Sequence, residues 1–375
     1  MKKVFVLLLA LLLTTPVLQA QAQSVRPAHV EIMEEAAQMQ FPEDKSDVQL
    51  PCPICGETVT WIALHMDAEL NTQDTRRLNN RHIYMAGDMV GVDIYDPKSN
   101  TGGFMFRTNK ENEHSVIHLN GYDLNASQGV LMAEHGEVSI VGEGEAWGRR
   151  NNPDYGSNLD VRGEAEINVY GGTYYRNSPQ PMVKVVEDGT FNLYGGTLEG
   201  NDSQEASSIR VEGGTCNIYG GLLESGYGSR EGSNLTVEAE GKATIYGGEL
   251  LGGKDGVGGN ILTSGTLEIC GGIISGNVKE MDGSLTITGG ALDSVITAEN
   301  ITIEGGTFTR DVSQFVKEGV KVSHKDGVYT VGGENAALEQ PWLWIALGGA
   351  AVLVVVILLI VLSKKKNRQT EPEKA

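Results

Sequence analysis

Four tyrosines recur at one position of a repeated sequence pattern, and their spacing could build a ligand-binding surface. Each directly precedes a Gly-Gly pair, as in Ile-Tyr-Gly-Gly at 218–221. If the repeats stack, the rings lie one above another, and sugars bind to such a row of amphipathic aromatic rings by stacking. A purely structural role stays open, because aromatic neighbours also stabilise β-sheets. The four residues are Tyr170, Tyr194, Tyr219 and Tyr246.

Two cysteines and two histidines near the N-terminus have the chemistry of a zinc site. Cys52 and Cys55 stand in Cys-Pro-Ile-Cys-Gly, which places two thiols on one tight turn. Two thiolates on such a turn chelate a tetrahedral metal, and His65 and His82 would complete the ligands, although the spacing matches no standard zinc finger. A disulfide between Cys52 and Cys55 is the other interpretation, because exported proteins meet oxidising conditions. Both interpretations give the cysteines a structural role.

Two glutamates have a spacing that could support catalysis or bind calcium. Glu199 and Glu224 follow their Gly-Gly pairs at the same distance, so stacking would place their carboxylates about 5 Å apart, as in retaining glycosidases. Such a pair also suits calcium, and residues 252–260 resemble one calcium-binding nonapeptide turn. No Arg or Lys occupies a matching position, and acidic residues are numerous enough to stack by chance. We therefore expect no catalysis.

The elements that would position these residues belong to one repeat. The first glycines of the Gly-Gly pairs are 24, 25, 27, 24, 18 and 16 residues apart. Repeats of this length indicate a solenoid, in which each unit buries its apolar face against its neighbours. These glycines are Gly171, Gly195, Gly220, Gly247, Gly271, Gly289 and Gly305.

Hydrophobic and polar residues alternate before each Gly-Gly pair, which indicates β-strands with one face buried. A further glycine, six places earlier in most repeats, predicts another turn. The pattern therefore predicts an all-β protein, a parallel β-helix over residues 103–333. The aliphatic residues two places before each pair, expected to face inward, are Val169, Leu193, Ile218, Ile245, Ile269, Ile287 and Ile303.

Both ends of the chain have the features of targeting segments. Residues 1–22 have two lysines, a short apolar stretch and Ala-Gln-Ala at 20–22, which is typical of a secretory signal peptide. Residues 342–362 contain no charge and are long enough to cross about 30 Å of hydrocarbon. The basic tail at 363–375 is expected in the cytoplasm. We therefore expect a single-pass, type I protein of the cell membrane with an extracellular ectodomain.

Three shorter segments lie between these regions. Residues 23–48 include a helical pattern that could cap the open edge of the solenoid, where unpaired strands invite aggregation. Residues 49–95 form a small CxxC module, and residues 334–341 link the solenoid to the membrane span.

The acidic charge of the chain restricts its partners. The formal net charge is −20, and the two ends hold seven basic but only two acidic residues, which leaves −25 outside the membrane. Such a surface repels nucleic acid, so DNA and RNA partners are excluded. Divalent cations and neutral or basic ligands remain compatible.

Several motifs resemble a family of repeat-built surface proteins of gut bacteria. The stretch GGTFTRDVSQFVKEG at 305–319, followed by KDGVYTV at 325–331, is similar to the terminal coil of that family. CPICGETVTW (52–61) and RHIYMAGDM (81–89) resemble its CxxC, Trp and H-x-Y elements, and VIHLNGYDLNA (116–126) resembles its first coil. The resemblance implies a right-handed, pectate-lyase-like β-helix and a role in surface binding or adhesion. The expected membrane span departs from relatives anchored by sortase.

The sequence thus predicts a membrane-anchored bacterial surface protein that presents a β-helix for binding or adhesion. The expected ligand is an extracellular glycan or another host or bacterial surface ligand. A polysaccharide lyase or glycoside hydrolase on the same scaffold is one alternative, and a structural spacer that binds nothing is the other.

Overall fold

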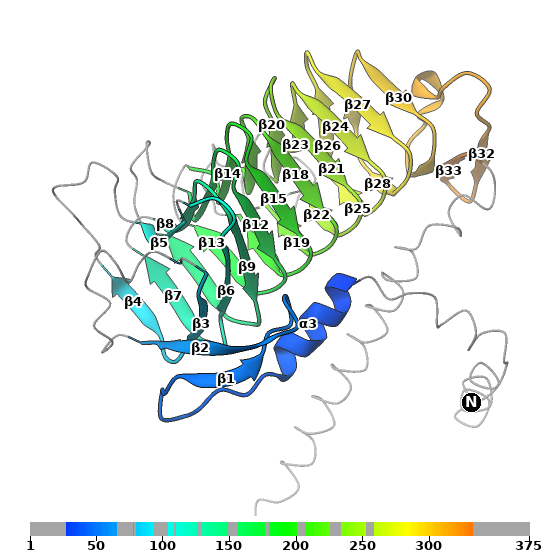
Figure 1. The fold of residues 1–375 in the computed structure, drawn as a ribbon. Helices are drawn as coiled ribbons and strands as arrows, with labels where there is room; N and C mark the ends of the chain where they lie inside the picture. The colour runs from blue at the N-terminus through cyan, green and yellow to red at the C-terminus, as the bar shows by residue number, and fades with distance from the viewer. Residues whose placement is uncertain are drawn as a thin grey trace, which may run out of the picture.

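The chain forms a parallel β-solenoid built from three sheets (Figure 1). The computed structural model describes residues 28–332 except 66–77, 79, 93–103, 109, 127–128, 149–156, 177–179, 201–206, 226–233 and 253–258. Sheets A and C each have 12 strands and sheet B has nine. The prediction of an all-β parallel solenoid is confirmed.

Successive turns of the chain add one strand to each sheet in register. In sheet A, the strands from β3 to β30 pair in parallel, with β1 antiparallel to β2 at one edge. The strands of sheet A, in order, are β1 (Val48–Pro51), β2 (Thr58–Leu64), β3 (His82–Met85), β6 (His114–His118), β9 (Glu137–Val141), β12 (Glu166–Val169), β15 (Thr190–Leu193), β18 (Thr215–Ile218), β21 (Lys242–Ile245), β24 (Thr266–Ile269), β27 (Ser284–Ile287) and β30 (Ile301–Ile303).

Sheets B and C complete each turn. Sheet B contains β5 (Phe104–Thr108), β8 (Gly129–Ala133), β11 (Leu159–Val161), β14 (Val183–Val185), β17 (Ile209–Val211), β20 (Leu235–Val237), β23 (Gly259–Thr263), β26 (Asn277–Glu280) and β29 (Ile296–Thr297). Sheet C contains β4 (Met89–Val92), β7 (Asp123–Ala126), β10 (Glu145–Gly148), β13 (Thr173–Arg176), β16 (Thr197–Glu199), β19 (Leu222–Glu224), β22 (Glu249–Leu251), β25 (Ile273–Ser275), β28 (Ala291–Asp293), β31 (Gly306–Phe308), β33 (Val328–Val331) and β32 (Val322–Lys325).

The Gly-Gly pairs form the corner where the chain passes from sheet A to sheet C. Gly221 has φ +86°, a conformation that side chains disfavour. A Cβ added there would lie 2.8 Å from the carbonyl oxygen of Gly196 in the preceding turn. The pattern recurs because each turn stacks directly on the one before it.

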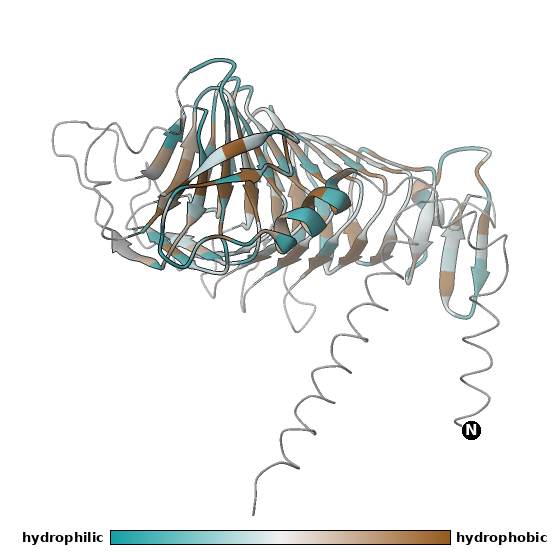
Figure 2. Ribbon diagram, turned by 60° about the horizontal axis from the view of Figure 1, so that its bottom comes forward, coloured by the Kyte–Doolittle hydropathy of each residue, from teal (hydrophilic) through white to brown (hydrophobic). Residues whose placement is uncertain are grey.

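The predicted aliphatic positions are buried inside the solenoid. Ile218 pairs with Ile245, and Ile245 pairs with Ile269 on the next strand. All three side chains are inaccessible to solvent. The stacked residues form one continuous core, in which each turn buries the apolar face of its neighbours. Figure 2 shows hydrophobic and hydrophilic residues alternating along the strands.

We call residues 28–57 the N-terminal cover: helix α3 (Ala28–Gln38) lies on the outward face of sheet A, and β1 is the edge strand of that sheet. The cover also includes the turn that leads into β2. Helix α3 runs along the side of the solenoid (Figures 1 and 2). The cover and sheet A share a second, smaller core that contains Ala36, Cys52, Trp61, Tyr84 and Tyr170. The strands β1 to β4, within the predicted CxxC module, are thus continuous with sheets A and C.

The C-terminal end of the described solenoid is closed by antiparallel strands. A 3₁₀ helix, η1 (Ser313–Phe315), leads into the β32–β33 hairpin, and β33 pairs with β31. No helix within the described residues is long and apolar enough to span a membrane. The predicted signal peptide, membrane span and tail lie outside those residues.

Candidate functional site

The four tyrosines predicted to stack form a continuous ladder at the outward edge of sheet A. Consecutive ring centroids from Tyr170 to Tyr246 are 4.7, 4.7 and 4.8 Å apart, with interplanar angles of 5–8°. The spacing equals the distance between neighbouring strands, because each tyrosine directly follows a strand of sheet A. Since each inner ring has a tyrosine on both sides, its two faces are turned toward its neighbours.

The N-terminal cover lies over the first part of this ladder. Tyr170 is only 9% exposed, whereas Tyr246 is 42% exposed. The His29 ring of helix α3 lies 5.4 Å from the Tyr194 ring and 6.4 Å from the Tyr219 ring. Tyr246 therefore forms the accessible end of the ladder, whereas Tyr194 and Tyr219 are half-buried.

The hydroxyls of Tyr170, Tyr194 and Tyr219 remain protonated at neutral pH. Burial raises the pKa of Tyr194 to about 12, and it raises the pKa values of Tyr170 and Tyr219 as well. The hydroxyls can thus donate hydrogen bonds to a ligand or to solvent.

Sheet C carries a second aromatic pair, which we did not predict from the sequence. The rings of Trp147 and Tyr175 stack at 4.8 Å and 17° on neighbouring strands. The Tyr175 hydroxyl donates a 2.5 Å hydrogen bond to Glu145, and burial raises the pKa of Tyr175. Tyr175 could have been found from the repeat, because it stands four places after Gly171, as Glu199 does after Gly195.

Glu199 and Glu224 continue the same outward column on the next two strands. They are register partners on β16 and β19, as the repeat predicts. Glu199 is exposed, while Glu224 is half-buried at one end of a cleft. The structure therefore places the two glutamates side by side on adjacent strands of sheet C.

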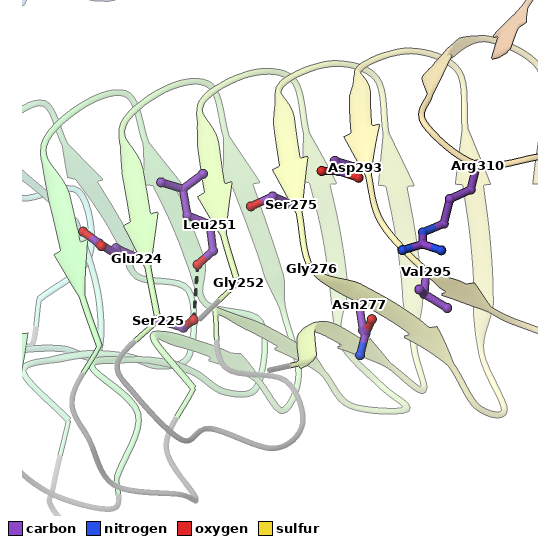
Figure 3. A pocket seen from close by; sticks show the side chains of 10 residues that line it. All are labelled: Glu224, Ser225, Leu251, Gly252, Ser275, Gly276, Asn277, Asp293, Val295 and Arg310. Atoms are coloured by element: carbon purple, nitrogen blue, oxygen red, sulfur yellow. Dashed lines mark hydrogen bonds between the residues drawn. The ribbon is translucent and has the colours of Figure 1, made fainter. Parts of the chain in front are cut away.

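The cleft lies where the chain leaves sheet C for sheet B, and its volume is about 370 Å³ (Figure 3). Asp293 and Arg310 line it together with Glu224. Asp293 accepts a 2.6 Å hydrogen bond from Thr309, the residue before Arg310. A basic side chain thus reaches this cleft, although no column of the repeat predicted one.

The CxxC turn and β3 bring three of the four predicted metal ligands together. Donor atoms of Cys52, Cys55 and His82 all lie within 4.8 Å of one another, and Cys55 Sγ is 3.8 Å from His82 Nε2. His65 does not join this group. Cys52 and Cys55 are both free thiols. Burial raises the pKa of the Cys52 thiol to about 11.

A second group of potential metal ligands lies at the corner between sheets B and A. Glu111, His135 and Glu164 come from three consecutive turns, and their donor atoms also lie within 4.8 Å of one another. Both carboxylates are exposed. Stacked turns bring acidic residues together in this way without any ligand, so the group by itself defines no site.

His118 was not singled out in the sequence, and the structure places it between the cover and sheet A. Its side chain is 3% exposed and contacts Phe41 and Trp61, with ring centroids 4.9 and 6.1 Å away. Burial lowers its pKa. The histidine therefore has a structural position beneath helix α3.

No protein-family model matches the sequence, and no curated protein or solved structure is significantly similar to it.

Proposed function

We propose that this chain is a bacterial cell-surface protein whose solenoid binds extracellular glycans, with no catalytic step. The observation that carries the proposal is the accessible end of the tyrosine ladder. Tyr246 has Tyr219 on one side, and its opposite neighbour in the column is Cys270, a much smaller residue. One face of the Tyr246 ring is therefore available for a sugar ring, and aromatic faces bind the apolar faces of sugars.

Polar residues beside Tyr246 can supply the directional contacts that a sugar needs. Thr244 and Glu268 are register partners in the neighbouring outward column. Thr244 is half-buried and Glu268 is exposed. Hydroxyl and carboxylate groups next to an aromatic face can form hydrogen bonds with sugar hydroxyls. The formal charge of −20 favours neutral or basic ligands over polyanions.

The proposed location is the outer face of the cell membrane. The signal-like residues 1–22, the apolar residues 342–362 and the basic tail support export and a single membrane anchor. We also propose that the solenoid is right-handed, since parallel strands are almost always joined by right-handed connections. A protein of this kind would hold its binding surface away from the membrane.

The proposal is tested by glycan capture with the full-length chain in detergent. Replacing Tyr219 and Tyr246 together with Ser should abolish capture while lowering stability only modestly, because each cross-strand pair contributes about 0.2–1 kcal/mol. Tyr175→Ser is the matched control, since it removes a tyrosine from the face of sheet C.

Three outcomes decide between the surfaces. Loss of capture in the double variant alone supports the ladder. Loss in Tyr175→Ser alone places the ligand on sheet C and contradicts the ladder. A wild-type chain that captures no glycan from a broad array leaves the structural spacer as the better account.

Polysaccharide cleavage is the second candidate, favoured by the cleft that contains Glu224, Asp293 and Arg310. Neighbouring carboxylates with a nearby cation can provide acid-base chemistry on a sugar chain. Incubation with a panel of polysaccharides tests this function, with Glu224→Gln as the inactive control. Products that form with the wild-type chain and not with this variant would show that the protein cleaves polysaccharides, and would contradict a function in binding alone.

A further inference from the structure

The turn between β1 and β2 presents two thiols to the neighbouring strand β3. Within the turn, the Cys52 amide donates to the carbonyl oxygen of Glu57, and the Gly56 amide donates to that of Cys52, both at 2.8 Å. Gly56 has φ +73°, which lets the chain turn back sharply. The result places buried Cys52 and exposed Cys55 within reach of His82.

The separations of the three donor atoms suit one tetrahedral ion. Zinc lies about 2.3 Å from thiolate sulfur and about 2.0 Å from imidazole nitrogen, so these two ligands stand roughly 3.6 Å apart around it. The distance from Cys55 Sγ to His82 Nε2 is 3.8 Å. Two sulfurs and one nitrogen also bind zinc in preference to calcium or magnesium, which take oxygen ligands.

His65 is too far along β2 to serve as the fourth ligand. His82 is the register partner of Trp61, and His65 stands four residues beyond Trp61. At about 3.3 Å per residue, that offset is roughly 13 Å. The group of donors therefore has three members in the described part of the chain.

We propose that Cys52, Cys55 and His82 bind one Zn²⁺ ion that fastens the N-terminal cover to the first turns of the solenoid and keeps a fourth position open to solvent. Cys52 and Cys55 lie in the turn that follows β1, the edge strand of sheet A, whereas His82 lies on β3 of the same sheet, two strands away. The ion would link this turn to β3 beside the second core, to which Cys52 belongs. Binding of the metal displaces one proton from each thiol, so two protons are released per ion. Water or an external ligand fills the fourth position, as in zinc sites with three protein ligands.

A metal-bound cover would control access to the ladder's first half. Helix α3 contacts sheet A beside Tyr170 and Tyr194, and Cys52 packs into the same core as Tyr170. Loss of the ion should therefore loosen residues 28–57 and leave the core of the solenoid intact, because that core is a separate cluster.

Metal content of the full-length chain, purified with Zn²⁺ and then dialysed, provides the test. We expect about one Zn²⁺ per chain in the wild type, and at least a tenfold lower content in Cys55→Ser and His82→Ala. His65→Ala and Glu164→Gln are the matched controls and should keep the ion. Cys55 is exposed, so its substitution should not prevent folding.

Two further measurements make the result specific. Replacement by Co²⁺ should give thiolate-to-metal charge-transfer absorption in the wild type and in His65→Ala, and this absorption should fall in Cys55→Ser. A chelator should speed hydrogen exchange in residues 28–57 of the wild type but leave the already fast exchange of Cys55→Ser unchanged. A wild type that stays metal-free, with Cys52 and Cys55 as free thiols or as a disulfide, overturns the proposal. Zinc that persists in Cys55→Ser, or is lost in His65→Ala, overturns it equally.

Discussion

His118 joins the solenoid to helix α3 through a hydrogen bond to the carbonyl oxygen of Ala36, 2.9 Å from its Nε2. The other ring nitrogen, Nδ1, accepts a 2.9 Å hydrogen bond from the Asn120 amide. A carbonyl oxygen only accepts and an amide only donates, so the ring is neutral with its proton on Nε2. Protonation of Nδ1 would remove the hydrogen bond from the Asn120 amide, because two N–H donors would then face each other.

This arrangement predicts that acid weakens the attachment of helix α3. Burial lowers the pKa of His118 below its usual value of 6.5, and the smaller effect of the Ala36 hydrogen bond acts the other way. The unfolded chain therefore takes up the proton first as the pH falls. The stabilisation is complete above pH 6.5 and is lost as the pH falls through the lower, folded-state pKa. Burial also lowers the pKa of His29, which acts in the same direction.

His118→Phe should reduce this pH dependence. The variant keeps a ring against Phe41 but loses the bond to Ala36, so we expect a loss of about 1 kcal/mol at pH 7.5. Its further loss on acidification should be smaller than that of the wild type. Thermal melts and proteolysis of residues 28–57 at pH 7.5 and 5 measure both effects. His324→Phe, at an exposed position at the opposite end of the molecule, provides the control. Equal pH dependence in His118→Phe and wild type would contradict the role of His118 in the pH dependence.

A ladder of asparagine side chains on sheet A should contribute measurably to stability. The side-chain Nδ2 of Asn192 donates to Asn168 Oδ1 and to Glu166 Oε1, both at 2.8 Å. Its Oδ1 accepts from Asn217 Nδ2 at 2.9 Å. Asn192→Ala removes these three hydrogen bonds, and we expect a loss of about 1–3 kcal/mol in the free energy of unfolding. Denaturant titration measures it. Thr286→Ala, further along the same outward column, should cost less, and an equal loss would show that the ladder adds nothing.

Ile245→Asp should prevent stable folding of the solenoid. The Ile245 side chain is fully buried in the main core, and an unpaired carboxylate there should cost at least about 4 kcal/mol. Thr244→Asp, on the outward side of the same strand, should remain folded. Circular dichroism and thermal melts compare the two variants, and a soluble, cooperatively folded Ile245→Asp protein would show that this column does not face inward.

Gly221→Ala and Gly327→Ala should separate backbone strain from crowding between turns. Both glycines have positive φ, +86° and +81°. An added Cβ meets the Gly196 carbonyl oxygen at 2.8 Å in the first case and nothing within 4 Å in the second. We expect about 1–2 kcal/mol for Gly327→Ala from conformation alone, and a clearly larger loss for Gly221→Ala. Equal losses in chemical denaturation would mean that the turns can separate to accept the methyl group.

Much of the fold could be predicted because each turn repeats the same local requirements. Alternation along a strand sends neighbouring side chains to opposite faces, so Ile218 and Tyr219 had to differ in burial once Ile218 faced inward. The Gly-Gly spacing likewise predicted that Glu199 and Glu224 would be register partners. The site was less predictable, since the contacts of His118 and Cys55 come from segments that the repeat does not contain.

The sequence by itself determined the parallel solenoid, its inward aliphatic columns and the stacking of the four tyrosines, because these depend on a period of two and a recurring corner. Only the tertiary structure decided which outward residues are covered. It placed helix α3 over Tyr170 and left Tyr246 exposed, and it brought His82, not His65, to the CxxC turn. It also put Arg310 in the cleft with Glu224. These relationships depend on how an irregular segment packs against a regular one, and no periodicity in the chain encodes the distance between them.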